Sequence, residues 1–206
     1  PVYFDLSVAN TMSLKLHRYL RHEGFAYRLL PVENKSDDPF IDSEILYDRL
    51  MNRFVWGKMN DPHIFIDENI QKTTEIVQIK NTFFRLAEKL QSEGQKEKAL
   101  AVLDRLYEVL PPGRFFMSHY DLYCSTLYFR NERMEAGDRI LQTLATESFD
   151  KIDFYLNMGP EYVDSYQRIT NRETAILKEA LRIARQFNRA VLSEEFNQKL
   201  ESLSAL

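Results

Sequence analysis

Apolar and polar positions follow a helical period through the stretch from Asn81 to Pro111. Apolar side chains recur at spacings of three and four residues over 83–90 and again over 99–110, with lysine and glutamate between them. This spacing predicts two amphipathic helices. Gly94 lies between them, where glycine most easily adopts the left-handed backbone that ends a helix. The stretch therefore predicts a helical hairpin that turns at Gly94 and ends at Pro111.

The hairpin resembles the tetratricopeptide repeat (TPR), whose helices pack through residues of fixed size at fixed positions. Ala87 and Ala99 are expected where the two helices approach most closely, and a larger side chain there would overpack the contact. The signature positions are matched by Phe83, Leu86, Ala87, Leu90, Gly94, Ala99, Leu103 and Pro111. The first repeat is assigned to about 80–113.

Two further copies of the hairpin are expected, because one pair of helices cannot bury its apolar face alone. The second, at about 117–150, places Asn131 at the turn and Ala136 where the first repeat has Ala99. Cys124 then occupies a small, buried packing position. The third, at about 174–206, is degraded, as terminal repeats often are. The predicted fold is mostly α, with TPR-like hairpins in a short right-handed stack.

The first 32 residues carry a different pattern. Residues 1–5 and 25–32 are short and rich in aromatic and branched side chains, which favours strands, whereas 12–22 has helical spacing. Gly24 is expected to end that helix. The order strand, helix, strand predicts a small N-terminal βαβ-like unit with parallel strands. The chain begins without Met, and we expect either that a preceding segment of a longer protein completes the sheet or that the unit packs on the helices.

A helix over 43–54, capped by Asp42 or Ser43, leads into a turn-rich connector that contains Trp56 and Gly57. Trp56 has two interpretations. A lone Trp beside Gly is most often a plug between substructures, and the alternative is a ring that stacks on a sugar or a partner. The expected division of the chain is an αβ unit with a connector helix at 1–66 and a repeat domain at 67–206.

The C-terminal part of the repeat domain contains longer helical patterns. The helix that begins near Met134 is expected to continue through Leu156 and to end at Gly159, which is followed by Pro. Residues 162–187 form one more helix, or two that are interrupted near Thr170.

Composition narrows the range of functions. The chain has 206 residues, 44% of them hydrophobic and 28% charged, which is ordinary for a globular protein. Its net charge of −4 provides no basic field, so nucleic acid is not an expected partner. No apolar run approaches the ~18 residues that span a bilayer.

Candidate chemistry is sparse. His17 and His22 are five positions apart, which does not match the spacing of four found at helical zinc sites. No glycine-rich phosphate loop or nucleophile motif is found. We therefore assign no catalytic residue, no metal ligand and no cofactor, and we do not expect this chain to be an enzyme by itself.

TPR domains bind peptides along the face that the first helices of the repeats line. By helical phase, that face contains Phe84, Arg85, Glu88, Asp121 and Tyr128, an aromatic and mildly acidic set without the Lys and Asn clamp for terminal carboxylates. The alternative is that Phe84 and Tyr128 are buried under neighbouring elements.

Two segments outside the repeats resemble a known family. The more distinctive is the connector, with Trp56-Gly57 and the run Met59-Asn60-Asp61-Pro62. The remaining matches are Pro1, Tyr3, Phe4, Leu16, Tyr19, Glu23, Gly24, Tyr27, Arg28, Leu29, Pro31, Tyr47, Asp48, Met51, Asn52 and Phe54. Together with the repeats, they resemble the C-terminal region of bacterial membrane proteins grouped as domain of unknown function 2723 or glycosyltransferase family 117, which is typical of Bacteroidetes-type bacteria.

The resemblance implies an N-terminal membrane domain similar to protein O-mannosyltransferases, with its catalytic acid outside this chain. It implies a location at the periplasmic face of the cytoplasmic membrane. The leading hypothesis is a non-catalytic interaction domain that positions protein, peptide or glycan acceptors for the membrane domain of the same chain. A second hypothesis is a purely structural or self-associating scaffold, and a weaker one is a cytosolic peptide-binding adaptor.

Overall fold

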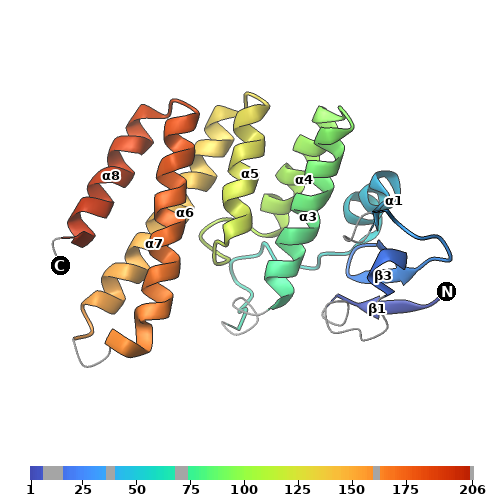
Figure 1. Ribbon diagram of the computed structural model, residues 1–206, viewed down its shortest axis with the longest axis horizontal. Coiled ribbons are helices and arrows are strands. Elements are labelled where there is room, and N and C mark those ends of the chain that lie inside the picture. The colour runs from blue at the N-terminus through green and yellow to red at the C-terminus, as the bar shows by residue number, and fades with distance from the viewer. Residues whose placement is uncertain (7–15, 36–39, 68–73, 160–162, 205–206) are drawn as a thin grey trace. The chain divides into compact units, whose positions relative to one another are not determined.

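The protein is mostly helical and carries a small N-terminal sheet, as its sequence pattern predicts. The computed structural model in Figure 1 describes residues 1–6, 16–35, 40–67, 74–159 and 163–204. These residues form two compact units, unit 1 (Pro1–Arg114) and unit 2 (Phe115–Leu206).

The sheet in unit 1 has four strands in the order β1-β3-β2-β4. Strands β1 (Tyr3–Asp5) and β2 (Leu20–His22) both pair antiparallel with β3 (Ala26–Leu29), while β4 (Phe40–Ile41) pairs parallel with β2. The two strands predicted near 1–5 and 25–32 are therefore present, and the prediction that they run parallel is wrong.

The expected helix over 12–22 is also corrected where the structure describes it. The segment consists of a short 3-10 helix, η2 (Leu16–Tyr19), which runs directly into β2. Residues 12–15 lie outside the described ranges. Gly24, with φ of 101°, occupies the first central position of a two-residue hairpin turn that the Glu23 amide closes on the Ala26 carbonyl at 2.9 Å. Glycine suits this turn, so Gly24 joins two strands and does not end a helix.

The connector helix begins where the sequence predicts. Helix α1 (Ser43–Asp48) is capped by Asp42, whose side chain accepts a hydrogen bond from the Ile45 amide at 3.1 Å. The chain then widens into a π-helical turn, η3 (Arg49–Arg53), where the Phe54 amide donates to the Arg49 carbonyl at 2.9 Å. Such turns are rare and often occur at functional sites.

The predicted helical hairpin is present as α3 (Thr74–Ser92) and α4 (Lys96–Val109). Its contact positions are fully or almost fully buried: Phe83, Leu86, Ala87, Leu90, Ala99, Leu103 and Leu106. The small residues Ala87 and Ala99 thus occupy the helix interface, as the repeat signature predicts. The sequence also favours Asp67 as the cap of a long helix that runs into this hairpin, and residues 68–73, over which that helix would begin, lie outside the described ranges.

The first hairpin belongs to the same compact unit as the sheet, so the expected boundary at 66 and 67 differs from the observed division at Arg114. Side chains join the two parts. The Phe83 ring on α3 lies 5.4 Å from the Trp56 ring, and the Ser43 hydroxyl donates to Glu93 at 2.7 Å. Because these contacts are long-range in sequence, local patterns do not show them.

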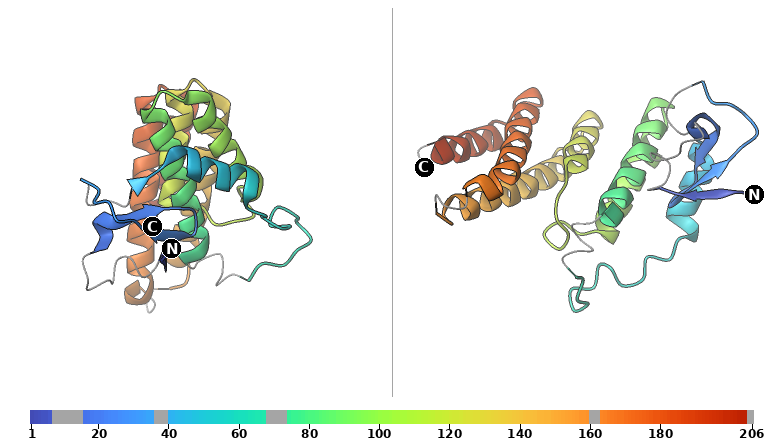
Figure 2. Two further views of the ribbon diagram at one scale, coloured as in Figure 1. Left: turned by 90° about the vertical axis from the view of Figure 1, so that its right-hand side faces the viewer. Right: turned by 60° about the horizontal axis from the view of Figure 1, so that its bottom comes forward.

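Unit 2 contains α5 (His119–Arg130), α6 (Met134–Leu156), α7 (Val163–Gln186) and α8 (Ala190–Ser204). Helix α6 packs on both α5 and α7, and α8 packs on α7 and α6, as Figure 2 shows. Helix α6 reaches Leu156 as predicted. Helix α7 is one continuous helix, which is the first of the two predicted alternatives, and it is not interrupted near Thr170.

The three hairpins share one turn geometry. Gly94, Glu132 and Asn188 have φ of 78°, 60° and 56°. In each turn, this residue donates to the carbonyl three positions earlier, and the next residue donates to the carbonyl five positions earlier, as in the pairs Gln95 to Leu90 and Arg133 to Tyr128. These are the hydrogen bonds of a Schellman-type helix end.

The common turn corrects the register of the second repeat by one residue. The left-handed residue is Glu132, whereas Asn131 has φ of −105° and its side chain donates to the Leu127 carbonyl. The counterpart of Ala99 is therefore Gly137 and not Ala136. In the same register, the small residue that corresponds to Ala87 is the buried Ser125, while Cys124 is buried at the preceding position. The sequence match at Asn131 is misleading because asparagine is the residue expected to adopt the left-handed backbone, whereas its neighbour Glu132 adopts it.

Candidate interaction surfaces

The predicted groove residues fall on two different units. Phe84, Arg85 and Glu88 lie on α3 in unit 1, where Phe84 and Arg85 are half-buried and Glu88 is exposed. These three share one helix and remain available as a surface. Phe84 is not enclosed, so the alternative of full burial does not hold for it.

Asp121 and Tyr128 do not line a surface, which corrects the prediction made from helical phase. Asp121 is fully buried and accepts a hydrogen bond from the Ser118 amide at 2.6 Å, so it caps the start of α5. Tyr128 is 2% exposed and belongs to the hairpin core, so the alternative of burial is confirmed for this residue. Both residues lie inward because the true register differs by one position, and one position on a helix turns a side chain by about 100°.

Trp56 packs as a plug within unit 1. Its ring lies 6.0 Å from Phe54, 5.8 Å from Phe25 and 5.4 Å from Phe83, and its indole N–H donates to the Leu50 carbonyl at 3.4 Å. Its neighbours thus come from the sheet, the connector and α3. Gly57 follows with φ of 61°, which favours glycine. The ring joins these elements, which is the role that the sequence favours.

In unit 2, the exposed face of α5 carries aromatic side chains that the sequence pattern does not place on a surface. His119 and Tyr123 are one helical turn apart, with ring centroids at 6.2 Å, and Tyr120 lies 4.1 Å from His119. Tyr123 is 46% exposed. Partial burial lowers the pKa of His119, which favours the neutral imidazole.

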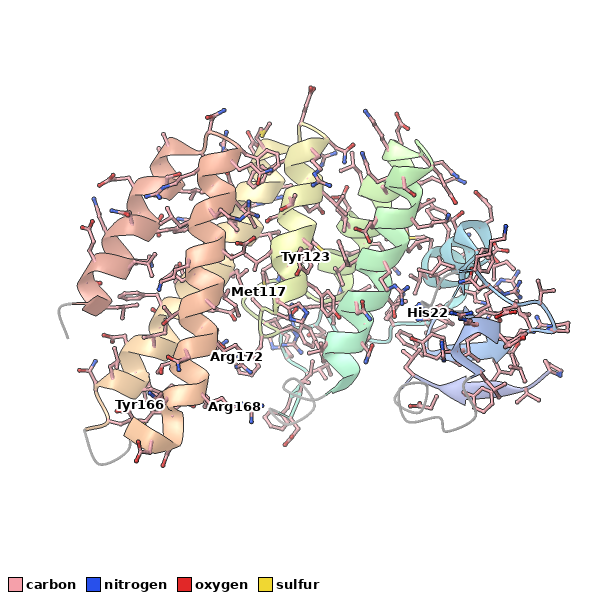
Figure 3. All side chains as sticks on the ribbon, in the orientation of Figure 1. His22, Met117, Tyr123, Tyr166, Arg168 and Arg172 are labelled. Atoms are coloured by element: carbon pink, nitrogen blue, oxygen red, sulfur yellow. The ribbon has the colours of Figure 1, made fainter. Side chains whose placement is uncertain are left out.

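Helix α7 lies beside α5 and adds charge to this side of unit 2. Figure 3 shows Arg168 and Arg172 projecting from α7 toward the side on which α5 lies. Arg172 binds the buried carboxylate of Glu173 through two nitrogens, at 2.8 and 3.1 Å. We call the exposed rings of α5 and the arginines of α7 the α5–α7 face. The signal for this face in the sequence is the pair His119 and Tyr123 at a spacing of four.

A second polar group lies on the sheet of unit 1. The carboxylate of Glu23 is fully buried, and it pairs with Arg21 of β2 through the Nε atom at 2.7 Å. Arg49 of η3 approaches the other carboxylate oxygen at 2.7 Å and donates to the Glu23 carbonyl at 3.0 Å. Arg28 of β3 lies at 3.8 Å. We call Arg21, Arg28, Arg49 and Glu23 the arginine cluster.

His22, between Arg21 and Glu23, faces the opposite side of the sheet and is 1% exposed. Its Nε2 lies 2.8 Å from the Gly24 carbonyl and 3.4 Å from the Thr82 hydroxyl of α3. Burial, aided by the charge of Arg85, lowers the pKa of His22 to about 4. The imidazole is therefore neutral at pH 7 and serves to join β2 to α3.

Within the described ranges, no group of three or more His, Cys, Asp or Glu is placed to hold a metal ion. None of the helices in this part of the chain is long and apolar enough to cross a membrane. Comparison of the chain with protein-family models, with curated proteins and with solved structures found no match. The α5–α7 face and the arginine cluster are therefore the features from which a function can be inferred.

Proposed function

We propose that this chain is a non-catalytic interaction domain that binds a protein or peptide segment on the α5–α7 face. The observation that supports this most is the exposed aromatic group of α5, together with the arginines of α7 that project toward the side on which α5 lies (Figure 3). Tyrosine and arginine are the residues that most often carry the binding energy of protein interfaces. Neighbouring first helices of helical hairpins also form the binding face in TPR proteins, which the hairpin sequence resembles.

In this proposal, the chain is the extracytoplasmic part of a membrane-anchored, glycosyltransferase-like protein. The resemblance of the connector and of the N-terminal segment to that family supports this assignment. The domain would then hold an acceptor protein or glycan near the membrane domain of the same chain. The sugar transfer itself would be performed by residues of that membrane domain.

The binding role is tested by placing a photo-crosslinking amino acid at Tyr123 in the native protein. The matched control carries it at Val191, which is 81% exposed and belongs to α8, a helix outside this face. A discrete adduct with another protein at position 123, and none at 191, supports the proposal. Equal labelling at both positions, or none at either, rejects it.

The same experiment distinguishes the second candidate function, a self-associating scaffold, from the binding of another protein. An adduct at position 123 with twice the mass of the protein would identify self-association through this face, which is the scaffold hypothesis. The location is tested separately by protease treatment of intact cells, spheroplasts and lysed membranes. Cleavage that begins with spheroplasts supports a periplasmic location, whereas cleavage only after lysis favours the cytosolic adaptor.

A further inference from the structure

The arginine cluster holds more positive charge than its buried carboxylate requires. Three guanidinium groups, from β2, β3 and η3, lie within 4 Å of Glu23. Asp42, 3.9 Å from Arg21, adds a second carboxylate at the rim. Among the ion pairs within 4 Å, the three guanidinium groups therefore exceed Glu23 and Asp42 by one positive charge, while Asp48, which also interacts with Arg49, pairs with Arg53. A single arginine would neutralise Glu23, so pairing alone does not account for three.

Arg28 is the member with donors to spare. Its side chain is 36% exposed, and among the described residues it pairs with Glu23 at 3.8 Å, which is too long for a hydrogen bond. Arg28 also lies directly opposite Arg21 in the β2–β3 register. Like charges in that position repel each other. An anion placed between the two guanidinium groups would relieve this repulsion.

The backbone holds the cluster in place before any ligand arrives. The tight turn at Gly24 sets the position of Glu23 next to β2 and β3, and the π-helical turn η3 begins at Arg49. Arg49 then binds both the carboxylate and the carbonyl of Glu23. Arginines fixed in this way lose little conformational freedom on binding, which favours affinity.

The open side of the cluster is bordered by aromatic residues. The strand register aligns Tyr3, Arg28, Arg21 and Phe40 in one row across the sheet. Tyr3 and Phe40, at the two ends, are 45% and 42% exposed, and the Tyr3 hydroxyl lies 3.5 Å from the Glu23 carboxylate. We propose that this row binds an oxyanion, either a carboxylate or a phosphate group, through Arg28 and Arg21.

The chemistry of guanidinium supports this class of ligand. Its planar fork of N–H donors matches the paired oxygens of carboxylate and phosphate, and such charge-assisted bonds are stronger than neutral ones. This inference is independent of the proposed function, because it concerns unit 1 and a small chemical group. The α5–α7 face of unit 2 plays no part in it.

The test is a titration of the whole ¹⁵N-labelled chain, followed through the arginine Nε–Hε resonances. Inorganic phosphate and acetate are added separately, with chloride as the control at the same ionic strength. The variant is Arg28→Gln, which removes the open donors and leaves the other two pairs to Glu23. The matched control is Arg53→Gln, an exposed arginine of η3 that pairs with Asp48 outside the cluster.

We expect the Arg21 resonance to shift with saturation for phosphate, for acetate or for both, and not for chloride. Arg28→Gln should weaken the binding about tenfold, whereas Arg53→Gln should leave it unchanged. The anion whose titration curve saturates shows whether the bound group is a carboxylate or a phosphate. Shifts that match those in chloride, or an affinity that Arg28→Gln leaves intact, would overturn the proposal. The chloride comparison on the unaltered chain decides the matter if the variant loses its fold.

Discussion

At the scale of single residues, His22 shows how burial sets chemistry. Its Nδ1 atom has no hydrogen-bond partner among the described residues, and its ring lies 5.1 Å from Tyr27. A charged imidazole would lose its hydration here and would face the charge of Arg85. The folded protein therefore keeps this histidine neutral at pH values well below its ordinary pKa of 6.5.

This predicts a loss of stability in mild acid. Below pH 6.5, the unfolded chain binds a proton at His22, while the folded chain does not until about pH 4. The free energy of unfolding of unit 1 should therefore fall as the pH is lowered, by roughly 2–3 kcal/mol between about pH 7 and 4.5. Urea unfolding followed by fluorescence of Trp56, the sole Trp, measures it.

The control for this prediction compares two histidine variants. His22→Gln should remove most of the fall, whereas His63→Gln, at an exposed position of unit 1, should keep it. A pH dependence that His22→Gln leaves unchanged would assign the effect to other groups.

Gly137 is a second residue whose identity follows from its surroundings. A Cβ atom there would lie 2.5 Å from the Phe129 ring, which itself packs at 5.0 Å on Phe187. Gly137→Ala should therefore lower the stability of unit 2 by about 1–2 kcal/mol, even though alanine favours a helix. Thermal unfolding by circular dichroism measures this. In a Phe129→Leu background the cost should shrink, and an equal cost there would exclude the ring as its cause.

At the scale of elements, the hairpins require the same left-handed backbone at the turn, but they place different residues there. Gly94 adopts the left-handed backbone at little cost in free energy, whereas Glu132 adopts it although it carries a side chain. Nothing lies within 4 Å of a Cβ added at Gly94, so backbone conformation and not crowding sets the cost there. The two turns thus form a natural comparison.

Opposite substitutions at these turns should have opposite effects. Glu132→Gly should raise the free energy of unfolding by ~0.5–1 kcal/mol, and Gly94→Ala should lower it by a similar amount. Urea unfolding by circular dichroism for unit 2, and by Trp56 fluorescence for unit 1, gives the two values. If both substitutions destabilise, contacts of the Glu132 side chain outweigh the backbone cost.

At the scale of the whole molecule, the chain is organised as two compact units that divide after Arg114. Unit 1 joins the sheet, the connector and the first hairpin through Trp56, Phe83 and the Ser43–Glu93 hydrogen bond. Arg114 itself donates to the Met59 and Ile64 carbonyls, and so ties the end of unit 1 to the connector.

The division predicts which fragments fold. Fragment 115–206 should be helical and unfold cooperatively, because its four helices bury one another. Fragment 67–206 should add a hairpin that lacks its contact with Trp56. Its amides over 83–103 should then exchange with solvent far faster than those of α6, as hydrogen exchange measures. If the amides of that hairpin were protected from exchange as strongly as those of α6, the boundary between residues 66 and 67 would be the correct one.

In the candidate surfaces, the sequence predicts the positions of some residues and not of others. Trp56 contacts the sheet, the connector and α3, which agrees with the role that a large ring beside glycine in a connector most often has. The prediction that Asp121 lines a surface is wrong because an error of one position in the repeat register turns a helical side chain from the surface to the core. The arginine cluster was not found, since its members come from three separate elements.

The sequence by itself determined the long helices, the first hairpin with its turn at Gly94, and the start of the connector helix at Asp42 or Ser43. These depend on contacts within a few residues, and periodicity and turn chemistry record such contacts directly. Only the tertiary structure decided the antiparallel pairing of β1 and β3, the division after Arg114, and the meeting of three arginines at Glu23. Each of these depends on which distant segments pack together, and a local pattern carries no record of that choice.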